Sequence, residues 1–170
     1  DGVINSSDTR TPGALGLVLE DVNVAVALMK PTVATDQTSF FALKATAGKV
    51  ALVGIDELTL EAQGVVVEVN SGKDRTNPNR EFAINFTKLP GGGMDVPTGS
   101  GTLKLDYASK RIKTGVYKAT LAVSDFVYIS GGFAFVQGPT MTVTLADKTT
   151  KTVKVTTIGG YVLEGSFDDL

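Results

Sequence analysis

The chain has no cysteine, no histidine and no tryptophan among its 170 residues. Without cysteine it forms no disulfide and no thiolate metal site, so the fold depends on packing and backbone ladders, or on a hard cation with oxygen ligands. Without histidine it lacks the commonest proton carrier near neutral pH, which excludes Ser–His–Asp and Cys–His catalysis and His-bound zinc. We therefore expect a protein that is not an enzyme.

The charge balance and the short apolar runs exclude two further classes. Sixteen basic residues stand against eighteen acidic ones, so we expect no nucleic acid partner, since phosphate binding needs clustered Lys and Arg. No stretch approaches the roughly 20 apolar residues of a membrane span. The first residues, Asp-Gly-Val-Ile-Asn, do not read as a secretory leader, so we expect a mature form or a fragment. Cysteine-free composition rich in Gly, Thr, Val and Asp favours a secreted protein in an extracellular or cell-surface location.

Apolar residues recur at every second position along most of the chain, which is the period of a pleated strand. The length and the 42% apolar content favour one all-β domain over residues 1–170, with 1–14 as an N-terminal segment. We expect roughly a dozen short strands. The clearest are residues 15–19, 22–28, 58–62, 82–86, 103–105 and 141–145.

Polar and glycine-rich segments separate these strands. Residues 73–80 form a polar loop, and residues 89–101 are the most flexible stretch. Residues 146–150 predict a tight hairpin between two Thr/Val strands. Three lysines lie in this hairpin and the strand after it: Lys148, Lys151 and Lys154. Lysines in this position are typical of a protected edge strand rather than of a binding patch.

Parts of the sequence repeat one another. Residues 17–24 and 121–128 share the order apolar, any, apolar, any, Asp, apolar, any, apolar, and each is followed by an apolar run that ends in Pro-Thr. Both a solenoid and a sandwich with two similar halves produce such an echo. Because the spacing is irregular, we expect sandwich-like antiparallel sheets, with a solenoid-like stack as the alternative.

Residues 1–8, Asp-Gly-Val-Ile-Asn-Ser-Ser-Asp, resemble the second half of a dockerin or EF-hand-type calcium loop. The resemblance implies carboxylate ligands from Asp1 and Asp8, a backbone carbonyl from Val3 and a direct or water-mediated contact from Asn5. It makes calcium the expected cofactor. The first half of the loop is absent, so Asp168 or Asp169 of a neighbouring copy could complete the site at a junction; an ordinary solvated terminus is the alternative.

Longer segments resemble repeats of very large bacterial surface or adhesin-like proteins. These segments are residues 19–31, 41–46, 53–60 and 126–135. The resemblance implies tandem organisation, export and rigidity that depends on calcium. It makes neighbouring copies, joined end to end, the expected partners.

No catalytic pair stands out. Glu20 with Asp21, Asp56 with Glu57, and Asp168 with Asp169 are adjacent in sequence, and neighbours on a strand face opposite sides of the sheet.

The aromatic residues could form a sugar-binding face, although strand alternation favours core packing for most of them. Tyr117 and Tyr128 are the expected exceptions. The leading hypothesis is a non-catalytic structural repeat of an extracellular surface, matrix or fibre-forming protein. A carbohydrate-binding or adhesive domain, with glycans as partners, is the alternative.

Overall fold

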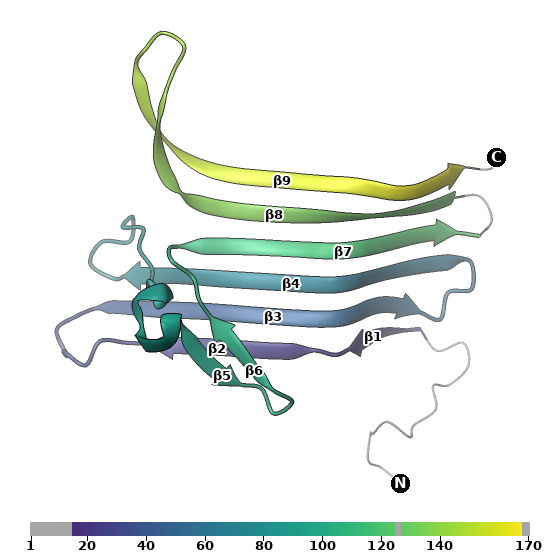
Figure 1. Ribbon diagram of the computed structural model, residues 1–170, viewed down its shortest axis with the longest axis horizontal. Coiled ribbons are helices and arrows are strands. Elements are labelled where there is room, and N and C mark those ends of the chain that lie inside the picture. The colour runs from purple at the N-terminus through teal and green to yellow at the C-terminus, as the bar shows by residue number, and fades with distance from the viewer. Residues whose placement is uncertain (1–14, 125–126, 168–170) are drawn as a thin grey trace.

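The computed structural model describes residues 15–124 and 127–167. In this part of the chain nine strands form two antiparallel sheets, and there is no α-helix (Figure 1). The prediction of an all-β fold with antiparallel sheets is confirmed. The large sheet contains β1 (Gly16–Glu20), β2 (Asn23–Met29), β3 (Thr38–Val53), β4 (Leu58–Asp74), β7 (Arg111–Val123), β8 (Val127–Thr144) and β9 (Thr150–Phe167).

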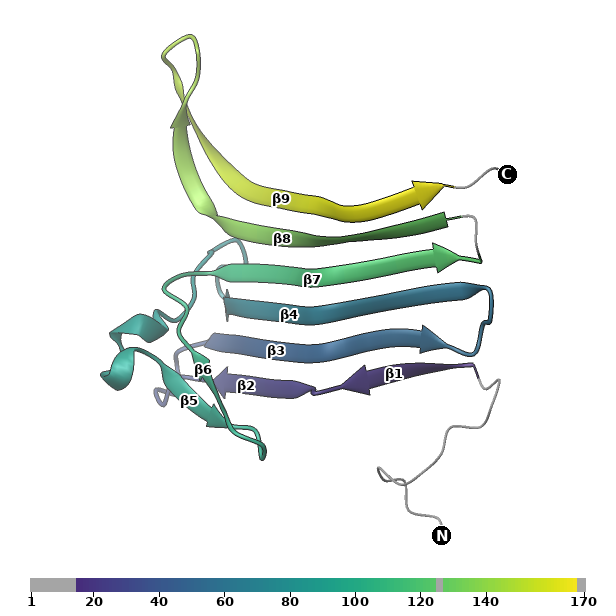
Figure 2. The same cartoon turned by 45° about the vertical axis from the view of Figure 1, so that its right-hand side comes forward.

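The large sheet is mainly a meander. β1 and β2 lie one after the other along β3, and the order then continues through β4, β7, β8 and β9 (Figures 1 and 2). The strands are fewer and longer than the sequence suggested: β8 and β9 each have 18 residues. Every pairing among the described residues is antiparallel, which differs from the stacked rungs of the solenoid alternative.

A small lobe covers one end of one face of this sheet. It contains the 3-10 turns η1 (Phe86–Lys88) and η2 (Pro90–Gly92), and the two-stranded sheet of β5 (Met94–Pro97) and β6 (Thr102–Leu105). The lobe packs against β2 and β3 (Figure 2). Two-layered packing is therefore confined to part of the large sheet. The buried core is small: Ala25, Ala27, Ala42, Phe86, Leu105 and Tyr107.

Size complementarity and hydrogen bonds hold the lobe on the sheet. Alanines on β2 and β3 leave room for the rings of Phe86 and Tyr107, which meet edge to face at 6.2 Å. The Tyr107 hydroxyl donates to the backbone oxygen of Leu43 at 2.9 Å. Asn70, which is fully buried on β4, donates to two lobe carbonyls at 2.8 Å each. A buried amide that satisfies two carbonyls fixes where the lobe begins and ends.

The prediction of a strand over residues 82–86 is wrong. The structure has extended loop here that leads into η1. Phe82 stacks edge to face on Phe40 at 5.4 Å, and its backbone oxygen accepts from Gly72 N at 2.8 Å. Ile84 and Phe86 pack into the lobe core. The alternation therefore comes from packing against the large sheet without a strand partner.

A line of irregular backbone crosses the large sheet near the middle of its long strands. Asp21 separates β1 from β2 with φ of 52°, and it faces Gly48 on β3, where a Cβ atom would lie 2.9 Å from the Asp21 carboxylate. On β4, Gly64 has φ of 61°, and a Cβ atom there would lie 2.8 Å from the Cβ of Tyr117. These positions require a residue without a side chain, or one that tolerates left-handed backbone.

The same line continues into β7, where the pairing with β8 shifts register between Val116 and Ala119. Val116 lies opposite Phe133, and Leu121 lies opposite Ile129. Directly opposed residues share a face, and Ile129 and Phe133 are four apart on the continuous strand β8. Val116 and Leu121 therefore share a face although they are five positions apart. The alternation of apolar and polar residues therefore shifts by one position at the irregular line, and this shift keeps the apolar side chains on one side of the sheet.

The hairpin between β8 and β9 forms an arm that bends away from the sheet (Figure 1). The predicted turn is confirmed: Leu145 N donates to Thr149 O at 2.7 Å, and Lys148 has φ of 69°. A register shift between Gln137 and Thr140 lies where the arm departs. β9 is an outer strand of the sheet, as the lysines predicted.

The two echoed segments occupy different structural positions. Residues 17–24 run along β1 and β2 at one edge of the sheet, whereas residues 121–128 include the connection from β7 to β8, of which 125–126 lie outside the described residues. The repeated pattern of apolar residues therefore does not correspond to a repeated structural unit.

Candidate functional site

The predicted calcium ligands cannot be placed. Asp1, Val3, Asn5, Asp8, Asp168 and Asp169 all lie outside the described residues. Within residues 15–124 and 127–167 there is no group of three or more acidic side chains arranged to hold a metal ion. Calcium binding stays a prediction from the sequence.

Neither described carboxylate pair converges on a shared cleft: of these four residues only Asp56 lines a hollow, one of about 350 Å³ beside the β3–β4 turn. Glu20 and Asp21 are exposed at the end of β1, and Asp56 and Glu57 are exposed in the turn between β3 and β4. The best-enclosed acid is Glu68 on β4, which is 8% exposed. Arg111 Nε lies 3.0 Å from its carboxylate and Lys113 Nζ lies 3.8 Å away, so ion pairing with β7 accounts for its charge.

Two further acids have structural partners. Asp74 accepts hydrogen bonds from the Thr76 hydroxyl and backbone and from Asn77 N, which lower the pKa of its carboxyl and close the turn after β4. Glu81 accepts from Lys110, Lys154 and Thr140, and these bonds lower its pKa to about 2. The Asp74 carboxylate therefore stabilises a local turn, and the Glu81 carboxylate links segments that lie far apart in the sequence.

The uncovered face of the large sheet is the most distinctive feature of the described molecule. Its apolar side chains come from every strand of that sheet, on both sides of the irregular line, and many are exposed. Leu17, Leu19, Val24, Val26, Leu28, Leu60, Leu121, Phe133, Ile158 and Val162 are each between 37% and 77% exposed. A contiguous apolar surface of this kind on a folded protein indicates an interaction surface.

Two shallow hollows lie near the irregular line, one on this face and one on the other face of the sheet. Leu60, Leu121, Ile129 and Phe133 line one of about 240 Å³, which confirms that both phases of the alternation share a side. The other, of about 300 Å³, lies on the opposite face and is lined by Tyr117 and Tyr161. Tyr161 pairs with Gly132, which alternates with Phe133, and the Tyr161 ring lies where a Cβ atom of Gly132 would point. The Tyr161 hydroxyl donates to the backbone oxygen of Tyr117 at 2.5 Å, which fixes the orientation of that ring.

The aromatic residues divide differently from the sequence prediction. Tyr107 is a core residue at 2% exposure, and Tyr117 is 70% exposed, as the sequence predicted for each. Phe133 and Tyr161, which we expected in a core, are each 47% exposed. They are exposed because the described chain supplies no second sheet opposite them.

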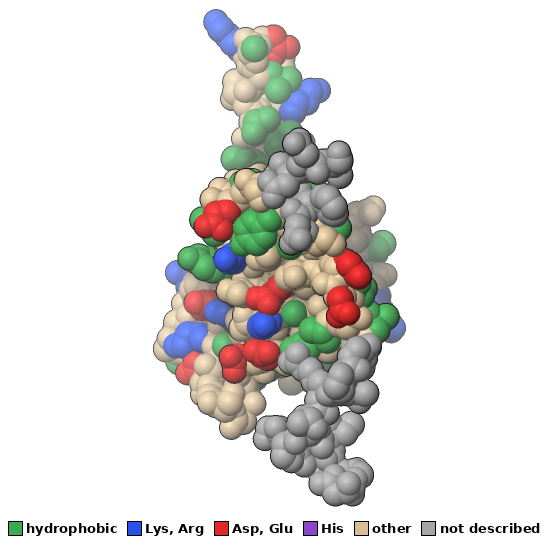
Figure 3. All heavy atoms as spheres, turned by 90° about the vertical axis from the view of Figure 1, so that its right-hand side faces the viewer, with side chains coloured by type: hydrophobic (Ala, Val, Ile, Leu, Met, Phe, Trp, Pro, Cys, Tyr) green, Lys and Arg blue, Asp and Glu red, His purple; other side chains and the backbone are tan. Residues whose placement is uncertain are grey.

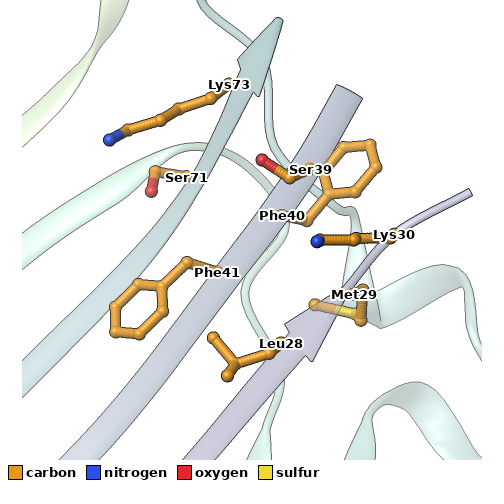
Figure 4. Close-up of a pocket in the computed structure, with 8 residues that line it drawn as sticks. All are labelled: Leu28, Met29, Lys30, Ser39, Phe40, Phe41, Ser71 and Lys73. Atoms are coloured by element: carbon orange, nitrogen blue, oxygen red, sulfur yellow. The ribbon is translucent and has the colours of Figure 1, made fainter. Parts of the chain in front are cut away.

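A larger cleft of about 800 Å³ lies at the end of β2 (Figure 4). Its walls come from both sides of the sheet: Leu28 and Phe41 point one way from the strands, and Met29 and Phe40 point the other way. Lys30, Ser39, Ser71 and Lys73 complete it. Because the lining side chains lie on both faces of the sheet end, they do not converge on one point as the polar groups of a small-molecule site do.

The two outer edges of the large sheet, formed by β1 with β2 and by β9, are the other exposed feature. Within the described residues β1 and β2 pair only with β3, and β9 pairs only with β8. An unpaired strand edge presents a row of backbone donors and acceptors that can recruit another strand. The arm at the β8–β9 turn stands clear of the body and carries charged side chains at its tip (Figure 3).

No protein-family model, no curated protein and no solved structure matches this chain. The resemblances to a dockerin-type loop and to bacterial surface repeats therefore stay predictions. In the described ranges no helix is long and apolar enough to cross a membrane.

Proposed function

We propose that the chain is a non-catalytic structural module of an extracellular surface, matrix or fibre-forming protein, and that it works by joining to further copies. The observation that carries this proposal is the large sheet itself, which has an exposed apolar face and two outer edges whose strands, β1, β2 and β9, have one partner each. Apolar surface and unpaired ladders both favour association. The acids that are best fixed in the structure, Glu68 and Glu81, pair with lysine or arginine.

Sedimentation velocity over a hundredfold range of concentration tests the proposal, with electron microscopy of the most concentrated sample. Association is expected, with chains or fibres as the largest species. A single monomeric boundary at every concentration, with and without calcium, would contradict a structural role that depends on self-association.

A carbohydrate-binding or adhesive function is the second candidate, because the exposed rings of Tyr117 and Tyr161 line one hollow on the face of the sheet opposite the apolar one. Exposed aromatic rings can stack against apolar faces of a ligand. A glycan array compares the native chain with Tyr117→Ala. Binding that is lost in the variant supports this candidate, and equal signals from both chains count against it.

Calcium is a separate part of the proposal and rests on residues 1–8 alone. Isothermal titration with Ca²⁺ is expected to show binding that Asp1→Asn with Asp8→Asn removes. Unchanged binding in this double variant would contradict the loop as the site.

A further inference from the structure

The two edges of the large sheet have compatible directions. Each step across the sheet, from β1 and β2 through β3, β4, β7 and β8 to β9, is antiparallel. β9 therefore runs opposite to β1 and β2. It also ends at the same end of the sheet where β1 begins (Figures 1 and 2). A second copy placed beside β9 would add its own β1 and β2 as an antiparallel neighbour, in continuation of the same meander.

Both edges also carry an interruption of the same kind. On β9, Val162 lies opposite Gly131 and Gly165 lies opposite Ile129, so both face the apolar side with two residues between them. On the other edge, cross-strand pairing places Leu19 and Val24 on the apolar side, although they are five positions apart and regular alternation would put them on opposite sides. The change of phase falls at residues 20–21, beside the left-handed Asp21.

From these matches we propose that β9 of one copy pairs with β1 and β2 of the next as a continuous antiparallel ladder, with Leu19 opposite Gly165 and Val22 opposite Val162. This inference rests on the proposed function and names its partner: a second copy of this chain. Asp21 then lies opposite Leu163, so the irregular line of one sheet runs directly into that of the next. Val24 lies opposite Gly160, and Val26 lies opposite Ile158.

The alternation selects this register over its neighbours. A slip of one residue would place the apolar side chains of one copy beside the polar side of the other. A slip of two would keep the faces but would separate the two interruptions, so that Leu19 would lie opposite Leu163. Only the proposed register keeps the apolar side chains of both copies on one face along the whole joint and also places Asp21 of one copy opposite Leu163 of the other.

The joint covers apolar side chains that are exposed in one copy. Val22 is 49% exposed and Val162 is 71% exposed. Beyond the Val24–Gly160 pair, Val26 and Ile158 are 43% and 77% exposed. Cross-strand pairs of branched residues stabilise a ladder. One contact opposes association, because Glu20 would lie opposite Glu164. Glu20 also has Lys49 opposite it on β3, which reduces the repulsion.

A face-to-face stack of two apolar sheets is the competing arrangement. It would cover the same surface, but it makes no use of the free ladders, of their antiparallel directions or of the aligned interruptions. Since the two arrangements bring different residues together, they can be distinguished by cross-linking.

The absence of cysteine makes engineered disulfides a clean probe. Two single-cysteine proteins, Val22→Cys and Val162→Cys, are mixed under mild oxidation. Directly opposed strand residues lie within disulfide reach, so a mixed dimer is expected. The matched control pairs Val26→Cys with Val162→Cys, which is four residues out of register and is expected to cross-link about tenfold more slowly, since its Cα separation exceeds disulfide reach. In a face-to-face stack, Phe133→Cys would form disulfide-linked dimers with itself, so this single variant tests that arrangement.

Equal cross-linking in and out of register would overturn the proposed ladder. Dimers of Phe133→Cys without dimers of the Val22→Cys and Val162→Cys mixture would also overturn it, and would leave the structural module standing. Sedimentation of the same samples separates these results from failure of the proposed function, in which the chains stay monomeric and no variant cross-links.

Discussion

The carboxylate of Glu81 lies 2.9 Å from Lys154 Nζ, which joins a loop next to the lobe to an outer strand 73 residues further along the chain. The same carboxylate lies 2.8 Å from Lys110 Nζ and accepts from the Thr140 hydroxyl at 3.1 Å. These contacts meet near the position where the β8–β9 arm leaves the sheet. Glu81 therefore connects the arm to the lobe side of the molecule.

The first prediction concerns the response of this connection to pH. Hydrogen bonds from Lys110, then Lys154 and Thr140, lower the pKa of Glu81 from 4.5 to about 2. Because the pKa is lower in the folded chain, the stabilisation is complete above pH 4.5 and is lost as the pH falls toward 2. Amide exchange in the arm, corrected for intrinsic rates, is expected to accelerate over this window.

Glu81→Gln is the matched variant. It is expected to exchange faster at neutral pH and to lose most of the pH dependence at the base of the arm. Asp147 at the tip of the arm also has a lowered pKa, because Thr149 donates to its carboxylate. Asp147 is present in both proteins, so the difference between their pH profiles is due to Glu81. Identical pH profiles would show that Glu81 does not hold the arm.

The second prediction concerns the lobe. Tyr107→Phe removes the hydroxyl that donates to Leu43 O and leaves the ring in place. Loss of a buried hydrogen bond is expected to lower the free energy of unfolding by about 0.5–1.5 kcal/mol. Urea denaturation measures the change. Tyr117→Phe, at a side chain that is 70% exposed, is the control and should change stability by less than about 0.5 kcal/mol.

The third prediction concerns the irregular line. Gly64→Ala places a Cβ 2.8 Å from the Cβ of Tyr117, in backbone with φ of 61°. The left-handed backbone alone costs about 1–2 kcal/mol, and the contact adds to it. Gly99→Ala is the matched control, with φ of 86° and no atom within 4 Å. Thermal unfolding should place Gly64→Ala well below Gly99→Ala, and equal midpoints would contradict the close approach.

The fourth prediction concerns charge at the proposed joint. Glu164→Lys would replace a like-charged pair with an opposite-charged one beside Glu20, so association should strengthen, with a lower dissociation constant at low salt. Glu57→Lys makes the same charge change in the β3–β4 turn and is the control. Sedimentation equilibrium compares the two. Equal strengthening by both variants would mean that net charge, and not the pairing of Glu20 with Glu164, controls association.

Alternation predicted the all-β class because its period of two is a local property of the backbone. The polar turn Asp-Lys-Thr likewise marked the β8–β9 hairpin correctly. The strand over residues 82–86 was predicted wrongly because apolar alternation also arises when Phe82, Ile84 and Phe86 pack on a neighbouring sheet without pairing. Local pattern does not reveal whether a ladder partner exists.

The exposed apolar face could not be predicted for a related reason. Alternation shows that Phe133 and Phe135 share a side of one strand, but it does not show whether another layer covers that side. One signal was present in the sequence: the phase of the alternation changes between Leu19 and Val22, and again between Ala62 and Val65. These changes coincide with Asp21 and Gly64, and they mark the line that crosses the sheet.

Hydrogen exchange as a function of protein concentration tests self-association through the sheet edges most directly. On concentration, the account predicts new protection of backbone amides in residues 19–28 of β1 and β2 and in the facing part of β9, residues 156–165, while the central strand β4 stays unchanged. Protection must appear at both edges together, because one joint contains both. Exchange at these edges that is independent of concentration, in a sample that sedimentation shows to be associated, would contradict it.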